Sequence, residues 1–270
     1  MRTKLRYWLI ALTITSILAF SNRALSVPLG YGVDNSNDLY SIDLSTATAT
    51  LIGNTGSFME ALAVSPSGAL FATDSNGSLY SLNLLTGAST FIGSTGLGNI
   101  EGLDFNGTTL LGTNFSNPTT VFAINPSNAT VTPVATTVPP QGVVRTLAVS
   151  GPNTGLLLAD SPSSQTLHSI DLTTGATIQM GTVISNAGIY GIDFFNTTLY
   201  GLGGEGEVVT IDPVTGATTL VGDTGDQIWL ALAIPAAASA SVPETTNTLA
   251  ILIPTFLLLG CARCRYARSV

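Results

Sequence analysis

Short, mostly apolar runs recur along the chain about every 40 residues, each followed by turn-forming residues. Five of these runs align without gaps and end in Asp or Asn: Leu39–Asp43, Leu79–Asn83, Val121–Asn125, Leu167–Asp171 and Val208–Asp212. Short apolar runs bounded by Gly, Asn and Asp predict β-strands. Regular spacing of this length predicts that each strand belongs to one unit of a repeat fold.

Each unit contains further strand-like runs around this one. A run that begins with a variable residue starts the unit: Glu60–Val64, Glu101–Phe105, Arg145–Val149, Tyr190–Phe194 and Leu230–Ile234. A second run follows it: Leu70–Asp74, Leu110–Asn114, Leu156–Asp160, Leu199–Gly203, and Gly30–Asp34 as the fifth copy. A last run follows a Thr-Gly turn, as after Gly87. Four short strands per unit, separated by turns, predict the blade of a β-propeller.

The two ends of the repeated region contain complementary parts of one unit. The region opens at a second strand, Gly30–Asp34, and closes at a first strand, Leu230–Ile234. Together they complete a fifth blade, which a closed ring needs and an open solenoid, the alternative architecture, does not. We therefore predict an all-β, five-bladed β-propeller over 27–235, closed by its N- and C-terminal strands. The pattern resembles secreted bacterial propellers with Asp-x-x-Thr-Gly turns, which implies the fold but no reaction.

Both ends of the chain have the composition of targeting segments. Residues 1–26 combine a basic start, an apolar stretch and a small-x-small cleavage site, which predicts a signal peptide, with an uncleaved anchor as the alternative. Residues 236–247 form a linker of small residues, 248–262 an apolar transmembrane helix, and 263–270 a basic tail that is expected in the cytoplasm. These segments imply the Sec translocon and signal peptidase as partners, and membrane contact through the C-terminal helix.

The C-terminal segments have the order of a known sorting signal. Val242, Pro243 and Glu244 precede the apolar stretch, and Arg263, Arg265 and Arg268 follow it. This order resembles the PEP-CTERM sorting signal of Gram-negative bacteria, although Thr245 replaces the second Pro. The resemblance implies an exosortase-type membrane transpeptidase as a partner, and an association with extracellular polysaccharide and biofilm. The alternative is an ordinary tail anchor.

Charge and cysteine content exclude several classes of partner and site. The formal net charge is −8, and Arg145 is the only Lys or Arg within 27–235, so we expect no binding of nucleic acid. Both cysteines, Cys261 and Cys264, lie C-terminal to the repeated region, so the propeller has no disulfide. We expect no cofactor and no metal. The alternative is calcium at Asp34–Asp38, which lacks the downstream Glu of an EF-hand and corresponds to a hairpin turn.

One aligned position of the repeat holds a different type of residue in almost every unit. The residue that begins each first strand is Glu60, Glu101, Arg145, Tyr190 or Leu230. In a propeller these residues would lie near one mouth of the central channel, where ligands usually bind. We therefore take Glu60, Glu101, Arg145 and Tyr190 as the candidate ligand site and expect Arg145 to pair with Glu60 or Glu101. A purely structural ion pair at the rim is the alternative.

These features together favour a binding protein over an enzyme. We predict an exported, envelope-sorted and non-enzymatic propeller that binds or scaffolds extracellular polysaccharide in a biofilm matrix. The first alternative is a glycan-active enzyme that uses a pair of carboxylates in the channel, drawn from Glu60, Glu101, Asp104 and Asp193. A structural surface protein without a small ligand is the second alternative.

Overall fold

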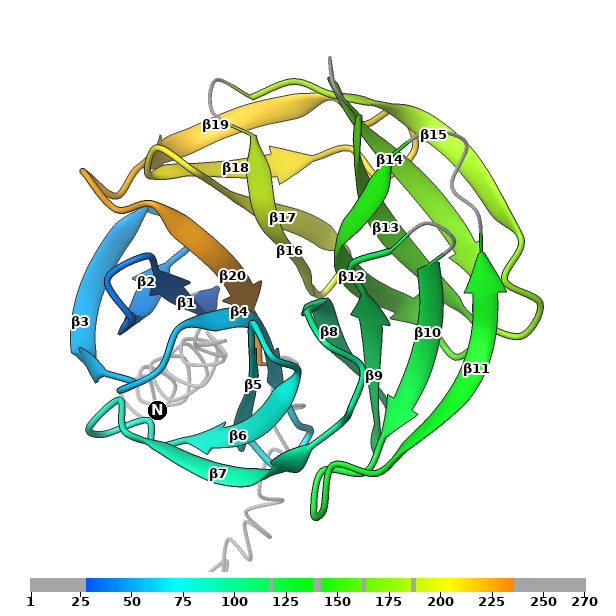
Figure 1. The fold of residues 1–270 in the computed structure, drawn as a ribbon. Coiled ribbons are helices and arrows are strands. Elements are labelled where there is room, and N and C mark those ends of the chain that lie inside the picture. Colours follow the sequence, from blue (N-terminus) through cyan, green and yellow to red (C-terminus); the bar gives the residue numbers. More distant parts are fainter. Residues whose placement is uncertain (1–27, 117–118, 138–141, 162–163, 186–187, 236–270) are drawn as a thin grey trace, which may run out of the picture. The chain divides into compact units, whose positions relative to one another are not determined.

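The computed structural model describes residues 28–116, 119–137, 142–161, 164–185 and 188–235, and within them every regular element is a strand. Twenty strands form five antiparallel sheets of four strands each (Figure 1). Two blades contain β4 (Met59–Val64), β5 (Leu70–Asp74), β6 (Ser78–Leu82) and β7 (Ser89–Ser94), and β8 (Ile100–Asn106), β9 (Thr109–Asn114), β10 (Thr119–Ile124) and β11 (Val131–Thr137). Two more contain β12 (Val143–Gly151), β13 (Thr154–Ser161), β14 (Ser164–Asp171) and β15 (Thr177–Val183), and β16 (Ile189–Phe195), β17 (Thr198–Gly203), β18 (Glu207–Ile211) and β19 (Thr218–Asp223).

The fifth blade joins the two ends of the described region. It contains β1 (Leu29–Asp34), β2 (Asp38–Asp43), β3 (Thr48–Asn54) and β20 (Trp229–Ala233) in the order β20-β1-β2-β3. Tyr31 pairs with Ala233 and Val33 with Ala231, so the orange β20 lies beside the blue β1 in Figure 1. The predicted five-bladed propeller is therefore confirmed, and the open solenoid is wrong.

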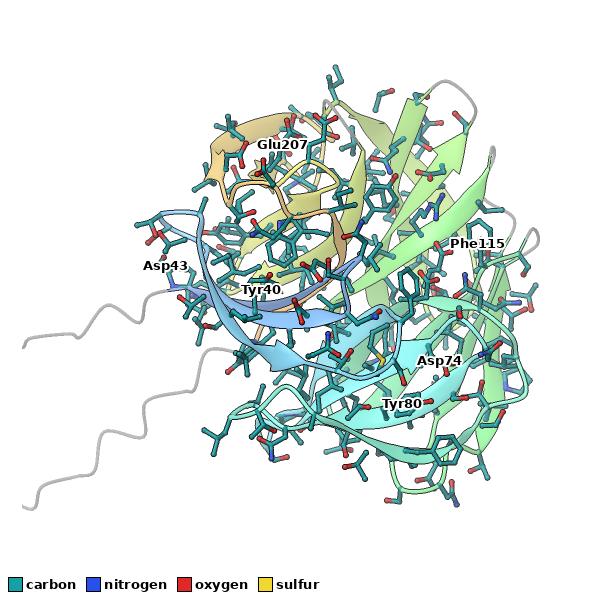
Figure 2. All side chains as sticks on the ribbon, turned by 60° about the vertical axis from the view of Figure 1, so that its left-hand side comes forward. Tyr40, Asp43, Asp74, Tyr80, Phe115 and Glu207 are labelled. Atoms are coloured by element: carbon teal, nitrogen blue, oxygen red, sulfur yellow. The ribbon has the colours of Figure 1, made fainter. Side chains whose placement is uncertain are left out.

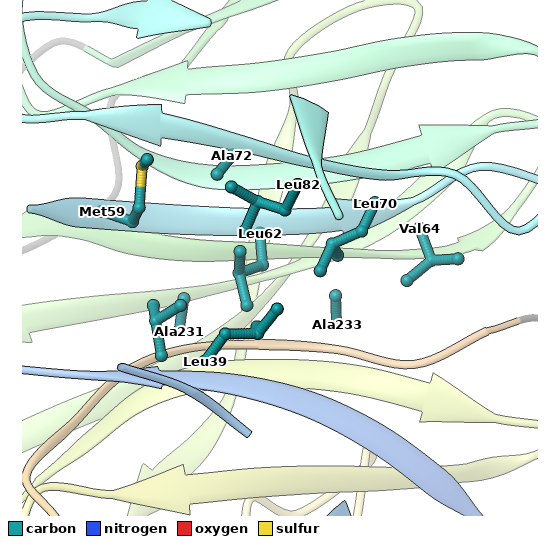
Figure 3. Close-up of a cluster of buried hydrophobic side chains, with 10 residues drawn as sticks. Leu39, Met59, Leu62, Val64, Leu70, Ala72, Leu82, Ala231 and Ala233 are labelled. Atoms are coloured by element: carbon teal, nitrogen blue, oxygen red, sulfur yellow. The ribbon is translucent and has the colours of Figure 1, made fainter. Parts of the chain in front are cut away.

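Small residues on the inner strands let neighbouring blades approach closely. A methyl group built on Gly191 of β16 would overlap the backbone of Leu232 in β20, the inner strand of the adjacent blade. Larger side chains fill the space between blades, where Leu39, Leu62 and Leu70 belong to one buried cluster with Ala231 and Ala233 (Figure 3). Burial of such apolar surface is the main stabilising term, because this part of the chain contains no cysteine.

The repeated turns join the last two strands of each blade and contact the outer strand of the neighbouring blade. Asp212 accepts hydrogen bonds from the backbone N–H groups of Val214 and Thr215, at 2.8 and 3.2 Å. The turn that ends at Gly87 packs against Gly53 of β3, whose Cα leaves room for the Thr86 carbonyl. A side chain at position 53 would fill that room, which explains why glycine recurs in both the turn and the outer strand.

The loop considered for calcium is a hairpin turn. Asp34 Oδ1 accepts the backbone N–H groups of Ser36 and Asp38 at 2.9 and 3.0 Å, and Asp34 Oδ2 accepts the hydroxyl of Tyr40 at 3.3 Å. Asp74 makes the matching bond with Tyr80 at 3.1 Å in the next blade, and Figure 2 shows these two side chains together. Because the Asp34 carboxylate supports the turn in this way, the hairpin interpretation explains the loop without a cation.

The predicted signal peptide (1–26), linker (236–247), transmembrane helix (248–262) and basic tail (263–270) lie outside the described residues. Among the residues that the structure does describe, no helix is long and apolar enough to cross a bilayer.

Candidate functional site

Each of the five inner strands contains a β-bulge near its first residue. The pairing of β4 with β5 skips from Met59 to Ala61, and the pairing of β8 with β9 skips from Ile100 to Gly102. The residues that the five ladders skip are Glu60, Glu101, Arg145, Tyr190 and Leu230. A bulge leaves one residue out of the hydrogen-bond ladder and redirects its side chain. The variable column of the sequence is therefore a ring of bulged residues, and we call this end of the propeller the bulge face.

Arg145 is the centre of the interactions at the bulge face. Its Nη1 lies 3.1 Å from Glu101 Oε2, and its Nε lies 2.6 Å from Asp160 Oδ2. The guanidinium carbon lies 5.1 Å from the ring centre of Phe115 and 5.5 Å from that of Tyr190, both within reach of a cation–π interaction. Burial works against the charged guanidinium, but the hydrogen bond to Asp160 and the charge of Glu101 raise the pKa of Arg145 overall.

The two predicted glutamates have different environments. Glu101 is buried and forms an ion pair with Arg145, which is one of the two pairings expected from the sequence. Asn99 Nδ2 also donates a hydrogen bond to Glu101 Oε1 at 2.8 Å. Burial raises the pKa of Glu101 to about 7, against the attraction of Arg145 and with a contribution from the charge of Glu60. Burial also raises the pKa of Glu60, which the charge of Arg145 lowers in part. The structure thus brings Glu60, Glu101, Arg145 and Tyr190 together.

Sequence reasoning missed Asp160, Gln165 and Phe115. Gln165 Nε2 donates to Asp160 Oδ1 at 2.7 Å and thereby orients the carboxylate toward Arg145. Phe115 follows β9 and remains 39% exposed (Figure 2). In the repeat alignment Asp160 falls at the same position as the turn residues Asp34 and Asp74, so its type gave no sign of a separate role. The only signal for its pairing with Arg145 was that the single Arg of the propeller needs a nearby acid.

Tyr190 contributes to the walls of two cavities. One, of about 830 Å³, is lined by Tyr190, Glu205, Asp223, Asp226, Gln227 and Ile228. The other, of about 380 Å³, is lined by Tyr190, Asp160, Ser164, Gln165, Thr182 and Ser185. An aromatic wall with a polar tip between two polar cavities is an arrangement that can hold a hydroxyl-rich ligand.

The remaining carboxylates of the predicted set lie at the opposite end of the inner strands, which we call the exit face. Asp104 accepts the backbone N–H groups of Phe105 and Val149, each at 2.6 Å. Asp193 accepts those of Phe194 and Ile234, at 2.6 and 2.5 Å. Each Asp therefore joins its own strand to the next blade. The four candidate carboxylates form two separate pairs rather than one site.

The exit-face pair lines a cavity of about 430 Å³ on the propeller axis. Every inner strand, or the residue directly after it, contributes to its wall: Val64, Asp104, Val149, Asp193 and Ile234. Burial raises the pKa of Asp104 to about 7, although the two backbone hydrogen bonds lower it. Burial and the charge of Asp104 raise the pKa of Asp193 well above its ordinary value. These groups hold protons at higher pH than ordinary aspartates do.

Both ends of the described chain leave at the exit face. Tyr31, early in β1, pairs with Ala233 at the end of β20, and the Pro28 carbonyl accepts the N–H of Leu44. The bulge face begins at the other end of these strands, beside Trp229. A ligand on the bulge face would therefore lie on the side of the propeller away from Pro28 and Pro235, the two ends of the described region.

The chain matches no protein-family model and no curated protein. Among solved structures it is similar to one titled "Structure of U3-55K", at 13% sequence identity and a TM-score of 0.46, covering 71% of this chain. The chain spans 59% of that protein's length. A likeness of this degree assigns no activity, so function has to be argued from the bulge face itself.

Proposed function

We propose that this protein is an exported, non-enzymatic propeller that binds or scaffolds extracellular polysaccharide at the cell envelope. The observation that supports this most is the ring of bulged residues at one end of the strands, where Tyr190 lines two cavities.

The chemistry of the bulge face fits a hydroxyl-rich polymer. Tyr190 and Phe115 supply aromatic surface, and Ser164, Gln165 and Gln227 supply hydroxyl and amide groups beside it. The acidic surface repels anionic lipids and nucleic acids, because Arg145 is the only base of the propeller and already pairs with Glu101 and Asp160.

The proposed route to the envelope uses both ends of the chain. The Sec translocon and signal peptidase would process residues 1–26, and an exosortase-type transpeptidase would act near Val242, Pro243 and Glu244. The apolar stretch and the basic Arg263, Arg265 and Arg268 would hold the protein in the membrane until that step. Mass spectrometry of the native protein tests this route: a terminus near Glu244 is expected, and a mature chain that still ends at Val270 would indicate a plain anchor.

Binding of the full chain to an array of polysaccharides tests the main proposal. We expect retention of at least one polymer, with loss of binding in Tyr190→Ala and in Glu101→Gln. Asp171→Asn is the matched control, because Asn83 and Asn125 form the equivalent turn in other blades. Absence of binding to every polymer would refute the proposal and favour a purely structural role. The chain length of the polymer should remain unchanged; shortening that disappears in Asp104→Asn would instead indicate an enzyme.

A further inference from the structure

The hairpin of β13 and β14 extends farther at the bulge face than the hairpin of β5 and β6. The pairing of β14 with β13 continues beyond Leu167 and ends where Ser161 pairs with Ser164. In β6 the pairing with β5 ends at Leu79, which is aligned with Leu167 in the repeat. The additional length contains the carboxylate that holds the bulged Arg145, so this departure from the repeat lies at the candidate site.

Gln165 connects the extended hairpin to the next blade. Its Nε2 donates to the Ile189 carbonyl at 2.9 Å, and its Oε1 accepts the N–H of Ile189 at 2.7 Å. The same Nε2 donates to Asp160 Oδ1 at 2.7 Å. Ile189 directly precedes the bulged Tyr190, so the hairpin, the carboxylate and the aromatic residue are held in one arrangement without a ligand. A site that is ordered in advance loses less conformational entropy when a ligand binds.

The cavity of about 380 Å³ lies against this hairpin, and most of the residues in its wall are polar. The Ser161 hydroxyl donates to the Ser164 carbonyl at 2.8 Å, and the Thr218 hydroxyl donates to the Ile184 carbonyl at 2.6 Å, which fixes two parts of the rim. Pockets for small ligands have volumes of roughly 300–1,000 Å³, so this cavity suits a small unit such as one sugar ring. Four residues supply hydroxyl groups to its wall: Ser161, Ser164, Thr182 and Ser185.

The Asp160 carboxylate can accept further hydrogen bonds from a ligand. Its Oδ2 accepts Arg145 Nε at 2.6 Å, and its Oδ1 accepts Gln165 Nε2 at 2.7 Å. An ionised carboxylate offers about four acceptor positions, so each oxygen keeps about one. The side chain of Asp160 lines the cavity and is 23% exposed, which makes it accessible to two adjacent hydroxyl groups. Hydrogen bonds to a charged acceptor are stronger than those between neutral groups.

The charges beside the cavity disfavour an anionic sugar. Arg145 is the only Lys or Arg within 27–235, and it already pairs with both Glu101 and Asp160. A carboxylate, sulfate or phosphate group in the cavity would lie near the charge of Asp160, and the propeller has no second base to balance it. A neutral sugar supplies hydroxyl donors without this repulsion.

We propose that this cavity binds one neutral hexose unit of the polysaccharide. Two adjacent hydroxyls of the sugar donate to the Asp160 carboxylate, the ring lies beside Tyr190, and the hydroxyls of Ser164 and Thr182 serve the remaining polar groups. This inference rests on the proposed polysaccharide-binding function, and it assigns the class of sugar and the subsite that recognises it.

Titration calorimetry of the full chain in mild detergent tests this inference with tetrasaccharides of glucose, mannose, galactose and glucuronate. We expect at least one of the neutral tetrasaccharides to bind at least about tenfold more tightly than the glucuronate. Ser164→Leu, which fills the cavity, should abolish this binding, and so should Thr182→Leu from β15. Asp226→Leu should keep it and is the matched control, because Asp226 is exposed and lines the other cavity of Tyr190.

The possible outcomes separate this inference from the broader proposal. Glucuronate that binds as tightly as the neutral sugars, or an array polymer that binds when no neutral tetrasaccharide does, overturns the neutral-hexose subsite and leaves polysaccharide binding intact. Unchanged binding in the two filling variants, or an equal loss in Asp226→Leu, also overturns it. The Tm of each variant reports its folding, and the exposed Thr182 decides the test if Ser164→Leu unfolds. Failure of every polysaccharide to bind overturns both proposals.

Discussion

The exit-face carboxylates predict that the propeller becomes less stable as the pH rises through neutrality. The pKa of Asp104 rises from 3.8 to about 7 on folding because burial penalises its charged form. A group whose pKa is raised in the folded state stabilises the fold fully below its unfolded pKa, and this contribution disappears as the pH rises through the folded pKa. The loss therefore begins near pH 4 and is complete above about pH 7.

The size of this effect follows from the same pKa difference. At ~1.36 kcal/mol per pH unit, a rise of about three units bounds the contribution of Asp104 at about 4 kcal/mol. Asp104 is partly exposed, so solvent screening reduces this to about 2 kcal/mol. Asp193 acts in the same direction, since burial and the charge of Asp104 also raise its pKa. For a domain of this size, about 2 kcal/mol corresponds to a Tm change of roughly 4–8 °C.

Thermal unfolding of the wild-type chain and of Asp104→Asn between pH 5 and pH 8 measures this effect. The Tm of the wild type should fall with rising pH, and the fall should be smaller in Asp104→Asn, because Asn stays neutral while its carbonyl still accepts one N–H. At the equivalent positions of the other inner strands, Ala63, Ala148 and Ala233 do not titrate, whereas Asp193 does and accounts for part of the fall that remains. Glu101→Gln is the control for the other carboxyl with a pKa near 7. A Tm that rises with pH, or an equal slope in Asp104→Asn, would refute the reasoning.

Three further substitutions test the fold and the bulge face. Gly53→Ala should lower the free energy of unfolding by about 2 kcal/mol or more in urea titrations, because the added methyl overlaps the Thr86 carbonyl and the φ of +156° is unfavourable for alanine; a neutral result would contradict the proposed blade contact. Arg145→Leu should cost about 2–3 kcal/mol at pH 8 and clearly less at pH 5, where the unpaired Glu101 takes up a proton; equal losses at both pH values would argue against this coupling. Leu62→Ala should cost about 2–5 kcal/mol at a site that is 2% exposed, whereas Leu220→Ala, 62% exposed, should cost less than about 1 kcal/mol; similar costs would contradict the assigned burial.

The repeat pattern was sufficient to predict the blades and their closure. The aligned runs such as Leu39–Asp43 predicted the strands, and the complementary ends predicted the pairing of β1 with β20. The variable column was also visible in the sequence, and it predicted the meeting of Glu101 with Arg145. These features depend on local periodicity or on positions that the repeat aligns, so no knowledge of distant contacts was needed.

Contacts that break the repeat could not be read in this way. Asp160 looks like the turn residues Asp34 and Asp74, yet it orients Arg145, because the bulge at position 145 redirects the guanidinium toward the second strand of the same blade. Asp104 and Asp193 lie apart from the two glutamates because the inner strands are short and extended. Glu101 and Asp104 are only three positions apart in β8, yet they lie toward opposite ends of that strand. The prediction of one carboxylate site considered residue type alone, and it therefore combined side chains of the bulge face with side chains of the exit face.

The difference between repeating and variable positions has a physical origin that bears on function. Positions where one blade meets the next, such as Gly53 against Thr86, accept only a small residue, since a larger side chain would overlap the neighbouring turn. The bulged residues are released from the ladder, so Glu60, Glu101 and Tyr190 can differ without loss of pairing. A ring that must close can therefore vary its chemistry at the bulge face at little cost in stability. For this reason the bulge face, rather than the exit-face aspartates that join blades through Val149 and Ile234, is the surface on which binding should be sought first.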